Sequence, residues 1–397
     1  MKQITNDVYS VGVIDWNMRS FHGNTFITRS GVTYSSYLIN DNEPALIDVV
    51  HKGFEDEFLK NISEIVNPEK IKHVILNHLE PDHSGAIECM AKVLKNTKFY
   101  GTAKLKEGLL KYYDLDIEIN VVKTGDKINL GNNTLTFVEV PMVHWPDSML
   151  TYCPEKKVLF SNDAFGQHIA TNKTFTDELE QGTLWKEVAK YYANILWPLG
   201  VMIEKSINNL LKMNLPIDFV APSHGLVWRQ DINKVIEKYL SWTKNEVKNK
   251  VVVVYETMWG STQIMAREII RALTDKNIEV KMFDISKTDF AEIAYEMLEA
   301  KAFVIGSSTH DNEMLAYIAG YIHFLKGMKP KNRIAVSFGS FGWAGGAVKE
   351  IATNLSSFGV EVIEQVGAKF KPNKEELEKC YQAGEKIAKV LLESESK

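Results

Sequence analysis

Short apolar runs and alternating apolar and polar residues dominate the first part of the chain, and both patterns are typical of β-structure. They predict strands at 8–13, 34–39, 45–50, 71–76 and 118–122, and a hairpin over 126–137 around Gly131-Asn132. We expect the strands within residues 1–50 to be antiparallel. Helical spacing covers 53–65 and 183–212, with Pro198 as the expected break in the second stretch. Mixed strands with helices to either side predict two sheets packed face to face under helices.

The pattern changes near residues 244–250, a charged and polar segment typical of a linker. After it, strands and helices alternate regularly. Strands are predicted at 251–255, 279–284, 302–307, 333–338 and 360–368, and helices at about 262–274, 289–299, 314–326, 345–356 and 373–392. Five such βα units predict a doubly wound parallel sheet with strand order 2-1-3-4-5. We therefore expect two domains, 1–249 and 250–397.

Composition narrows the classes of function. The chain has 397 residues, 45% of them hydrophobic and 24% charged, which suffices for sizeable cores. A net charge of -5 without a basic stripe argues against a nucleic-acid partner. We expect no membrane span and no signal peptide, and hence a cytoplasmic protein. Three scattered cysteines argue against disulfides, a zinc knuckle or a built-in rubredoxin-type iron site: Cys89, Cys153 and Cys380.

Potential metal ligands follow four strand-like runs in the first domain. Four of them lie in one loop directly after the strand 71–76, and three more follow the apolar runs 138–141, 158–160 and 219–222: His78, Glu80, Asp82 and His83, then His144, Asp163 and His224. Because ligand sites in α/β sheets form beyond the carboxyl ends of strands, these groups can converge in one cleft. The plainer alternative is a set of capping aspartates and surface histidines.

The ligand types indicate which metal would bind. Imidazole and thiolate sets favour zinc, whereas four histidines with three carboxylates suit iron or manganese better. Seven groups are too many for one ion. Two metals about 3.5–4 Å apart, bridged by Asp163, would use them all.

Three loops of the second domain have the composition of a phosphate and ring site. Hydroxyls and free backbone N–H groups at a helix N-terminus favour one phosphate, and Trp259 or Trp343 could stack on a planar ring. The candidate residues are Thr257, Met258, Trp259, Gly260, Ser261 and Thr262, then Ser307, Ser308, Thr309 and His310, and finally Ser340, Phe341, Gly342, Trp343 and Gly345. The sequence contains neither G-x-G-x-x-G nor G-K-[ST], so FMN fits better than a dinucleotide or ATP. Tight turns alone are the alternative interpretation.

Together, the His78-x-Glu80-x-Asp82-His83 loop, the three later ligands and the 257–262 loop resemble flavodiiron proteins, over essentially the whole chain. The resemblance implies a metallo-β-lactamase-like αββα sandwich followed by a flavodoxin-like domain. It further implies that His78, Glu80 and His144 bind one iron, that Asp82, His83 and His224 bind the other, and that Asp163 bridges them. In hydrolases of the superfamily, a histidine usually occupies the position of Glu80.

The resemblance also implies an activity. The family reduces O2 to water, NO to nitrous oxide, or both, with electrons passing from a rubredoxin through FMN to the irons. It implies head-to-tail homodimers, in which one subunit's flavin faces the other's metals, and leaves tetramers open. Because the chain stops after the flavin domain, we expect the donor to be a separate protein.

Two other functions remain open at this point: a metal-dependent hydrolase, and an electron carrier whose first domain is only a scaffold. Tyr192 and His22 are candidate donors near bound oxygen, although a structural role is the better expectation for both. His168 is a third candidate for a place around the metals.

Overall fold

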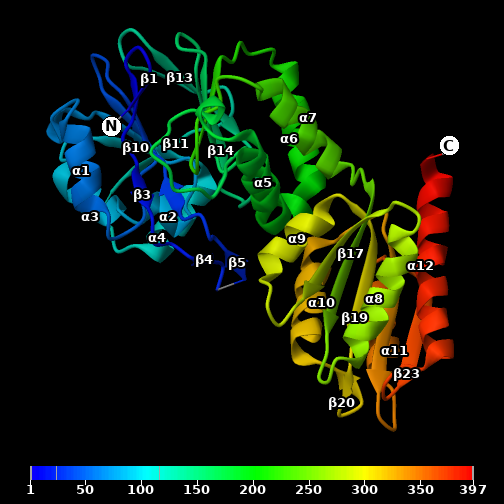
Figure 1. Cartoon of the computed structure of the whole chain (residues 1–397). Helices are drawn as coiled ribbons and strands as arrows, with labels where there is room; N and C mark the ends of the chain where they lie inside the picture. Colours follow the sequence, from blue (N-terminus) through cyan, green and yellow to red (C-terminus); the bar gives the residue numbers. More distant parts are fainter. Residues whose placement is uncertain (1, 24, 116, 396–397) are drawn as a thin grey trace. The chain divides into compact units, whose positions relative to one another are not determined.

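The computed structural model describes residues 2–23, 25–115 and 117–395 (Figure 1). These residues form two compact units. The first consists of Met1–Ser20, Thr28–Tyr191 and Leu199–Leu240, and the second of Phe21–Ile27, Tyr192–Pro198 and Ser241–Lys397. Among the described residues, no helix combines the length and apolar character needed to cross a membrane.

The first unit contains a seven-stranded sheet built from very short strands. Its order is β1 (Lys2–Thr5), β2 (Val8–Ser10), β7 (Tyr37–Ile39), β8 (Ala45–Ile47), β9 (His73–Ile75), β10 (Lys98–Gly101) and β11 (Ile119–Val121). The β1–β2, β2–β7 and β7–β8 pairs are antiparallel, as predicted for residues 1–50, and the pairs from β8 to β11 are parallel. The carboxyl ends of β8 and β9 therefore lie at the same edge.

A second sheet of five strands packs against the first. Its order is β12 (Lys127–Asn129), β13 (Thr134–Glu139), β14 (Met149–Cys153), β15 (Val158–Asn162) and β16 (Phe219–Pro222), with only β15 and β16 parallel. The predicted hairpin is confirmed, since Asn129 pairs with Thr134 across the turn. One core joins the two sheets, with Ile47 and Ile75 from the first and Phe137 and Phe160 from the second. The sheets thus face each other, as predicted.

Helices flank this sandwich (Figure 1). They are α1 (Glu55–Ser63), α2 (Pro81–Ser84), α3 (Ile87–Val93), α4 (Ala103–Tyr112), α5 (Gln181–Tyr191), α6 (Gly200–Lys212) and α7 (Ile232–Thr243), with 3-10 turns η1 (Pro68–Lys70) and η2 (Thr176–Glu178). The predicted break at Pro198 is present, because a π-helical turn, η3 (Tyr192–Leu196), and a 3-10 turn, η4 (Trp197–Leu199), separate α5 from α6. Strands β3 (Val13–Asp15) and β6 (Val32–Tyr34) pair with each other within this unit. Strands β4 (Ser20–Phe21) and β5 (Phe26–Ile27) also pair with each other, and they lie largely in the segment Phe21–Ile27 of the second unit.

The second unit is a parallel five-stranded sheet of order β18-β17-β19-β22-β23, the predicted 2-1-3-4-5 arrangement. The strands are β17 (Lys248–Glu256), β18 (Glu279–Asp284), β19 (Ala300–Ser307), β22 (Ile334–Phe341) and β23 (Glu361–Lys369), with a small hairpin of β20 (Thr309–His310) and β21 (Glu313–Met314). The helices are α8 (Ser261–Thr274), α9 (Phe290–Leu298), α10 (Ala316–Met328), α11 (Ala347–Ser357) and α12 (Lys374–Glu395). Helices α8 and α12 share one core with the sheet through Met265, Ile269, Ala383 and Ile387.

The expected linker is shorter than its composition suggests. Strand β17 already begins at Lys248, so the last part of the polar 244–250 segment pairs with Ala300 of β19. Charged residues can form the beginning of a strand when their backbone groups pair with a neighbouring strand. The composition of the segment does not reveal such pairing. The domain boundary between 249 and 250 stays a prediction.

Candidate metal centre and flavin pocket

The ligand loop is anchored to both sheets of the first unit through Asn77, two residues after β9. Its backbone N–H donates to Asp48 Oδ1 (2.6 Å), while its side-chain oxygen accepts from the Thr151 hydroxyl in β14 (2.7 Å). The backbone N–H of Met149, also in β14, donates to the Asn77 carbonyl (3.0 Å). Pro81 then begins the short helix α2, where its fixed φ suits the first helical position. The loop is therefore held rigidly between the sheets before any ligand binds.

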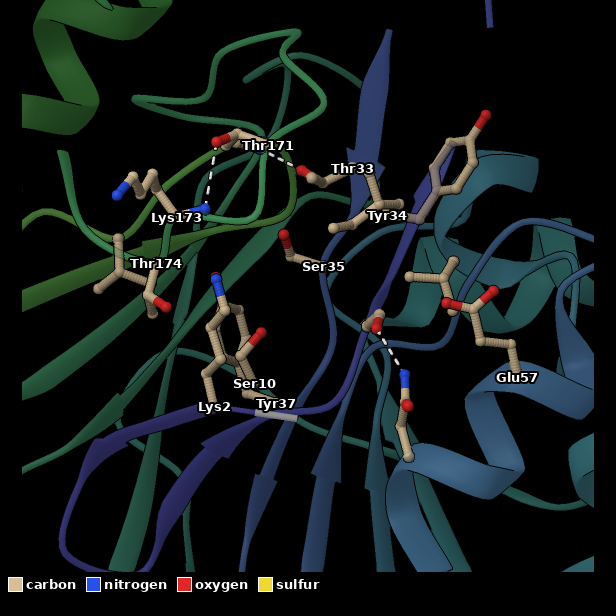
Figure 2. Close-up of a pocket in the computed structure, with 16 residues that line it drawn as sticks. Lys2, Ser10, Thr33, Tyr34, Ser35, Tyr37, Glu57, Thr171, Lys173 and Thr174 are labelled. Atoms are coloured by element: carbon tan, nitrogen blue, oxygen red, sulfur yellow. Dashed lines mark hydrogen bonds between the residues drawn. The ribbon is translucent and has the colours of Figure 1, made fainter. Parts of the chain in front are cut away.

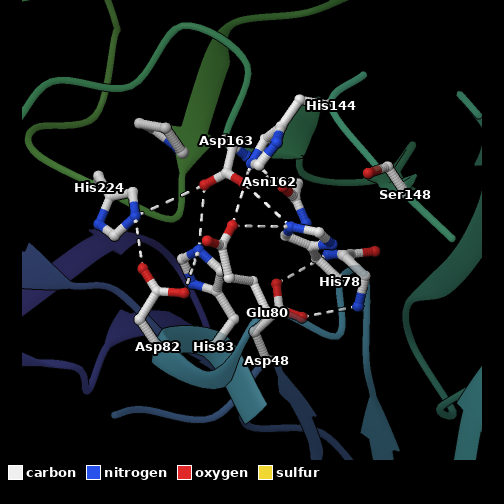
Figure 3. A network of polar contacts seen from close by, with 12 residues as sticks. Asp48, His78, Glu80, Asp82, His83, His144, Ser148, Asn162, Asp163 and His224 are labelled. Carbon is white, nitrogen blue, oxygen red and sulfur yellow. Dashed lines mark hydrogen bonds and ion pairs between the residues drawn. The ribbon is translucent and has the colours of Figure 1, made fainter. Parts of the chain in front are cut away.

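The structure brings all seven candidate ligands together (Figure 3). They form two groups, within each of which the potential ligand atoms lie within 4.8 Å of one another. The first group is His78, Glu80, His144 and Asp163, and the second is Asp82, His83 and His224. His78 and His83 are completely buried, and Glu80 and His144 are half-buried. The division matches the one that the resemblance implies, although metal binding by these residues stays a prediction.

Asp163 lies between the two groups and turns one oxygen toward each. Its Oδ2 is 3.5 Å from His78 Nε2 and 3.1 Å from His144 Nε2. Its Oδ1 is 3.0 Å from His83 Nε2 and 3.6 Å from His224 Nε2. A carboxylate shared in this way is suited to bridge two cations.

The ionisation of the cluster also fits a cationic guest. Burial lowers the pKa of the His78 imidazole, but its hydrogen bonds to Asp147 and Glu80 outweigh burial and raise the pKa to about 10. The pKa of His144 is likewise about 10, because Asp163 and Glu80 outweigh its burial. Burial raises the pKa of Asp163, yet the neighbouring imidazoles, His83 foremost, hold it well below its usual value. The pKa of Asp82 is lowered as well, so both aspartates stay charged and favour positive charge at the imidazole nitrogens.

Several buried atoms of the cluster lack a hydrogen bond of suitable geometry within the described parts of the chain, although ion-pair contacts join most of them: both oxygens of Asp163, both ring nitrogens of His83 and Oδ1 of Asp82. Buried polar atoms are rarely left in this state, because the loss of water is costly without a new partner. Bound metal ions would coordinate these oxygens and the His83 Nε2. The donor set therefore fits a pair of metal ions.

A layer of residues behind the ligands orients two of the imidazoles. Asp147 Oδ2 lies 3.1 Å from His78 Nδ1 and accepts the Leu79 N–H at 2.7 Å. His224 Nδ1 donates to the Thr33 carbonyl at 2.7 Å. Since each ring holds a proton on Nδ1, its Nε2 faces the cluster and can bind a metal once any proton on Nε2 is displaced. The sequence interpretation missed Asp147, Asp48, Asn77 and Thr33, and the only available signal was the general need of a metal-binding histidine for such a partner.

The three other candidates differ in position. His168 is buried, and its ring meets that of His224 edge-on with centroids 4.8 Å apart, so it contacts a ligand of the second group. Tyr192 belongs to the second unit, where its ring packs on Trp242 at 4.8 Å. His22 also belongs to that unit. Roles of these three near bound oxygen stay predictions.

A cavity of about 190 Å³ is lined in part by Thr33, the residue whose carbonyl holds His224 (Figure 2). Thr33 and Gly225 form part of its wall, and the Gly225 N–H donates to Thr33 Oγ1 at 2.6 Å. Lys2, Lys173, Glu57 and several hydroxyl side chains also line it, together with apolar residues such as Val13 and Val227. Its lining is therefore suited to water and polar solutes.

The second unit has a pocket of about 480 Å³ where its βα loops meet. Ten of the fifteen predicted contacts line it: Met258, Trp259, Ser261, Ser308, Thr309, His310, Ser340, Phe341, Gly342 and Trp343. Asp311, Asn312, Ala344 and Phe370 also line it and were not predicted. Trp259 and Trp343 are 92% and 88% exposed, so their rings stand free at the rim.

The other five predicted contacts lie outside the pocket lining, and the structure assigns several of them to its support. Thr262 is fully buried, and its hydroxyl bonds to those of Ser308 and Ser340, both at 3.0 Å. Thr257 Oγ1 accepts the N–H of Gly260, whose φ of +87° favours glycine. Ser307 Oγ accepts the Leu315 N–H at 2.9 Å, and Gly345 lies beside the ring of Phe341, which does line the pocket. The open N-terminus of α8 and the hydroxyls beside it fit a phosphate group.

Comparisons with known proteins agree with this architecture. The models of the ODP family beta lactamase and of flavodoxin match residues 32–225 and 253–384. The fold superimposes on the rubredoxin oxygen:oxidoreductase of Desulfovibrio gigas with a TM-score of 0.94, at 34% identity over 98% of both chains. The flavodiiron protein of Giardia intestinalis gives 0.93 at 32% identity, over 98% of this chain and 96% of that one. The chain belongs to the flavodiiron protein family.

Relatives of this flavodiiron protein are named for a redox activity. It is 41% identical to a nitric oxide reductase of Moorella thermoacetica over 97% of each chain. It is 38% identical to the anaerobic nitric oxide reductase flavorubredoxin of Escherichia coli, over 97% of this chain and 81% of that one. The predicted fold class and family are thus confirmed, as is the expectation of an oxidoreductase. The hydrolase alternative is not favoured.

Proposed function

We propose that this flavodiiron protein reduces O2 to water, NO to nitrous oxide, or both, at a pair of non-haem irons. FMN in the second unit would relay electrons from a separate donor such as rubredoxin. The position of Asp163 is the observation that carries the proposal, because its two oxygens face two separate ligand groups. The names of the relatives support both gases, since one is a nitric oxide reductase and another a rubredoxin oxygen:oxidoreductase.

In this proposal the first group and the second group each hold one iron. Glu80 gives the first group a carboxylate, which together with Asp82 and Asp163 makes the ligand set harder than one of imidazoles and thiolates. Two ferrous ions and a reduced flavin would together supply the four electrons that O2 needs, or the two that a pair of NO molecules needs. The half-buried Glu80 and His144 lie where the cluster is reached from outside.

The surrounding residues hold this centre in place rather than take part in the redox step. Asp147 and the Thr33 carbonyl fix the His78 and His224 rings, and burial of the cluster keeps bulk water away. At the second site, Ser261 and Ser308 would receive the flavin phosphate, and the exposed Trp259 and Trp343 would stack on the ring. We further propose a cytoplasmic head-to-tail homodimer, in which each flavin serves the partner's metals.

Anaerobic reduction followed by separate pulses of O2 and NO tests the proposal. The iron- and flavin-loaded protein should be reoxidised by at least one gas much faster than free flavin is. Reoxidation no faster than that of free flavin would refute the reductase. His83→Asn separates the remaining alternative, because an electron carrier would keep its flavin chemistry, whereas a reductase should lose gas consumption with its flavin intact.

A further inference from the structure

A small apolar cavity is lined by chain neighbours of two metal ligands and by none of the ligands themselves. Its volume is about 30 Å³, and among its lining residues are Val143, Ala164, Phe165, Ile203, Ile207 and Leu210. No polar atom of the residues that line it faces the cavity. A space of at least ~10–15 Å³ is enough for one water-sized guest, so this one has room for a single small molecule.

One wall of the cavity is continuous with the metal ligands. Val143 directly precedes His144, and Ala164 and Phe165 directly follow Asp163, the carboxylate shared by both groups. The polar backbone of this wall bonds elsewhere, since the Phe165 N–H donates to Tyr239 Oη at 2.9 Å. An occupant of the cavity would therefore lie against the segments that carry the first ligand group and the bridge.

The opposite wall is the apolar stripe of α6. Ile203, Ile207 and Leu210 follow one another at helical spacing and are buried, while Leu211 on the same helix is 52% exposed. Two further lining residues, Ala164 and Ser206, are only half-buried, so the cavity lies close to the surface. The cavity thus lies between the surface and the segments that carry the ligands.

The chemistry of the lining selects the kind of guest. Small cavities lined only by apolar groups stay dry and take up apolar guests such as xenon, because water finds no partners there. The larger cavity behind Thr33 is lined by lysines and hydroxyls and is the opposite case (Figure 2). O2 and NO are small, uncharged and weakly solvated, so the apolar cavity would concentrate them where the polar one would not.

We infer that this apolar cavity holds the diatomic gas on its way to the metal centre. The inference rests on the proposed function in taking a gas as the substrate. It assigns to Val143, Phe165, Ile207 and Leu210 a role in substrate access, separate from metal binding and from flavin binding.

Xenon provides a test that does not depend on turnover. Crystals of the metal- and flavin-loaded protein under xenon pressure should show a xenon peak in this cavity. The substitution Ile207→Phe, which fills the cavity, should remove the peak, and Leu210→Ala, which enlarges it, should raise the occupancy. Leu211→Phe makes a similar change on the exposed face of α6 and should leave the peak unchanged. A cavity without xenon in the unsubstituted protein would overturn the inference.

Stopped-flow mixing of the reduced protein with O2 or NO provides the kinetic test. Ile207→Phe should slow the second-order reaction with gas about tenfold, a barrier higher by about 1.4 kcal/mol, and leave the rate at saturating gas and the iron content unchanged. Leu211→Phe should change neither rate.

Equal rates in all three proteins would overturn the gas site while leaving the proposed reductase activity intact. An unsubstituted protein that consumes neither gas would instead refute the proposed function, and the gas site with it. If Ile207→Phe does not fold, Leu210→Ala decides by its xenon occupancy, and an unchanged occupancy counts against the inference.

Discussion

The metal cluster and the flavin pocket differ in burial and in charge. The cluster is buried and charged, and its carboxylates and imidazoles oppose one another over 3.0–3.6 Å. The pocket has an open rim with two almost fully exposed tryptophans over a floor of hydroxyls that already bond to one another. The carboxylates of the cluster need bound cations or protons to balance their charge, whereas the hydroxyls on the floor of the pocket are neutral and already have partners. We expect metal loss to change the protein itself, and flavin loss to change only its function.

The largest difference between the two sites is expected when the shared carboxylate of the metal cluster is removed. Asp163→Asn deletes the charge that faces four imidazoles, so iron binding and gas consumption should be abolished while flavin content stays the same. Metal analysis, flavin absorbance and a gas electrode measure the three properties. Asp177→Asn, which removes a carboxylate paired with Arg229 outside the cluster, is the matched control. A variant that retains both irons and full turnover would contradict the bridging role.

Metal removal combined with a change of pH tests the charge balance directly. In the metal-free protein His78 and His144 have pKa values of about 10, above the usual 6.5, so they bind protons more tightly folded than unfolded. Their contribution to stability is fully present below pH 6.5 and is lost as the pH rises through 10. In the presence of a chelator, we expect the free energy of unfolding to fall by about 3–5 kcal/mol between pH 6.5 and pH 10.

Denaturant unfolding at pH 6.5 and pH 10, with and without bound iron, measures this loss. Iron-loaded protein should show a clearly smaller change, because its ligand nitrogens carry no proton in either condition. Identical pH dependence of the two forms would show that the imidazoles are not held charged by their neighbours.

The next effect concerns the residue behind the first group. Asp147→Asn weakens the interaction that orients His78, so metal affinity should fall by roughly 10–100-fold without loss of the ligand itself. Competition with a chelator of known affinity gives the value. Asp126→Asn, at a loop aspartate that accepts the Lys123 N–H, controls for a general effect of such a change. Unchanged metal affinity would mean that Asp147 stabilises the loop but does not affect metal binding through His78.

In the flavin pocket, a comparable substitution should have a smaller effect. Thr262→Val removes the hydroxyl that joins Ser308 to Ser340, and we expect FMN to bind about fivefold more weakly, a change of about 1 kcal/mol. Fluorescence titration of the flavin-free protein measures it, with Thr353→Val on the exposed face of α11 as control. A loss of iron in the Thr262 variant would mean that the two sites are not independent.

The smallest effect is expected at the rim of the pocket. Trp343 is 88% exposed, so Trp343→Leu should change the unfolding free energy of the flavin-free protein by no more than ~0.5 kcal/mol. Denaturant titration should show a much larger loss for Trp228→Leu, since Trp228 is completely buried. A large loss at Trp343 would mean that the rim is part of the core.

Sequence patterns were most informative where chemistry and topology coincide. The seven potential ligands were expected to converge because they follow strand-like runs, and the structure shows that these runs belong to two facing sheets, β9 to one and β13, β15 and β16 to the other. The βα alternation after residue 250 likewise predicted strand order, with limits that moved by a few residues at most. In both regions, the features that carry the prediction lie within a few neighbouring residues: a ligand just after an apolar run, or the alternation of a strand with a helix.

The missed residues have partners far away in the sequence. Asp147 matters because its carboxylate reaches His78, and Thr33 because its carbonyl meets His224, 191 positions later. A backbone carbonyl has no sequence signature, and an aspartate in a turn is common. Phe370 follows the last strand and returns to the pocket through its backbone bond to Phe341, a closure that depends on the assembled sheet.

The way the chain divides between its two units has a practical consequence for anyone who wishes to study them separately. It passes from one unit to the other five times, after Ser20, Ile27, Tyr191, Pro198 and Leu240. A polypeptide starting at residue 250 would lack Asn194, whose amide donates to the Ala291 carbonyl, and Trp242, whose indole N–H donates to Glu299. Measurements of electron transfer on such a truncated domain would therefore also reflect the loss of these contacts. Hybrids between relatives should exchange all three segments of the second unit together: Phe21–Ile27, Tyr192–Pro198 and Ser241–Lys397.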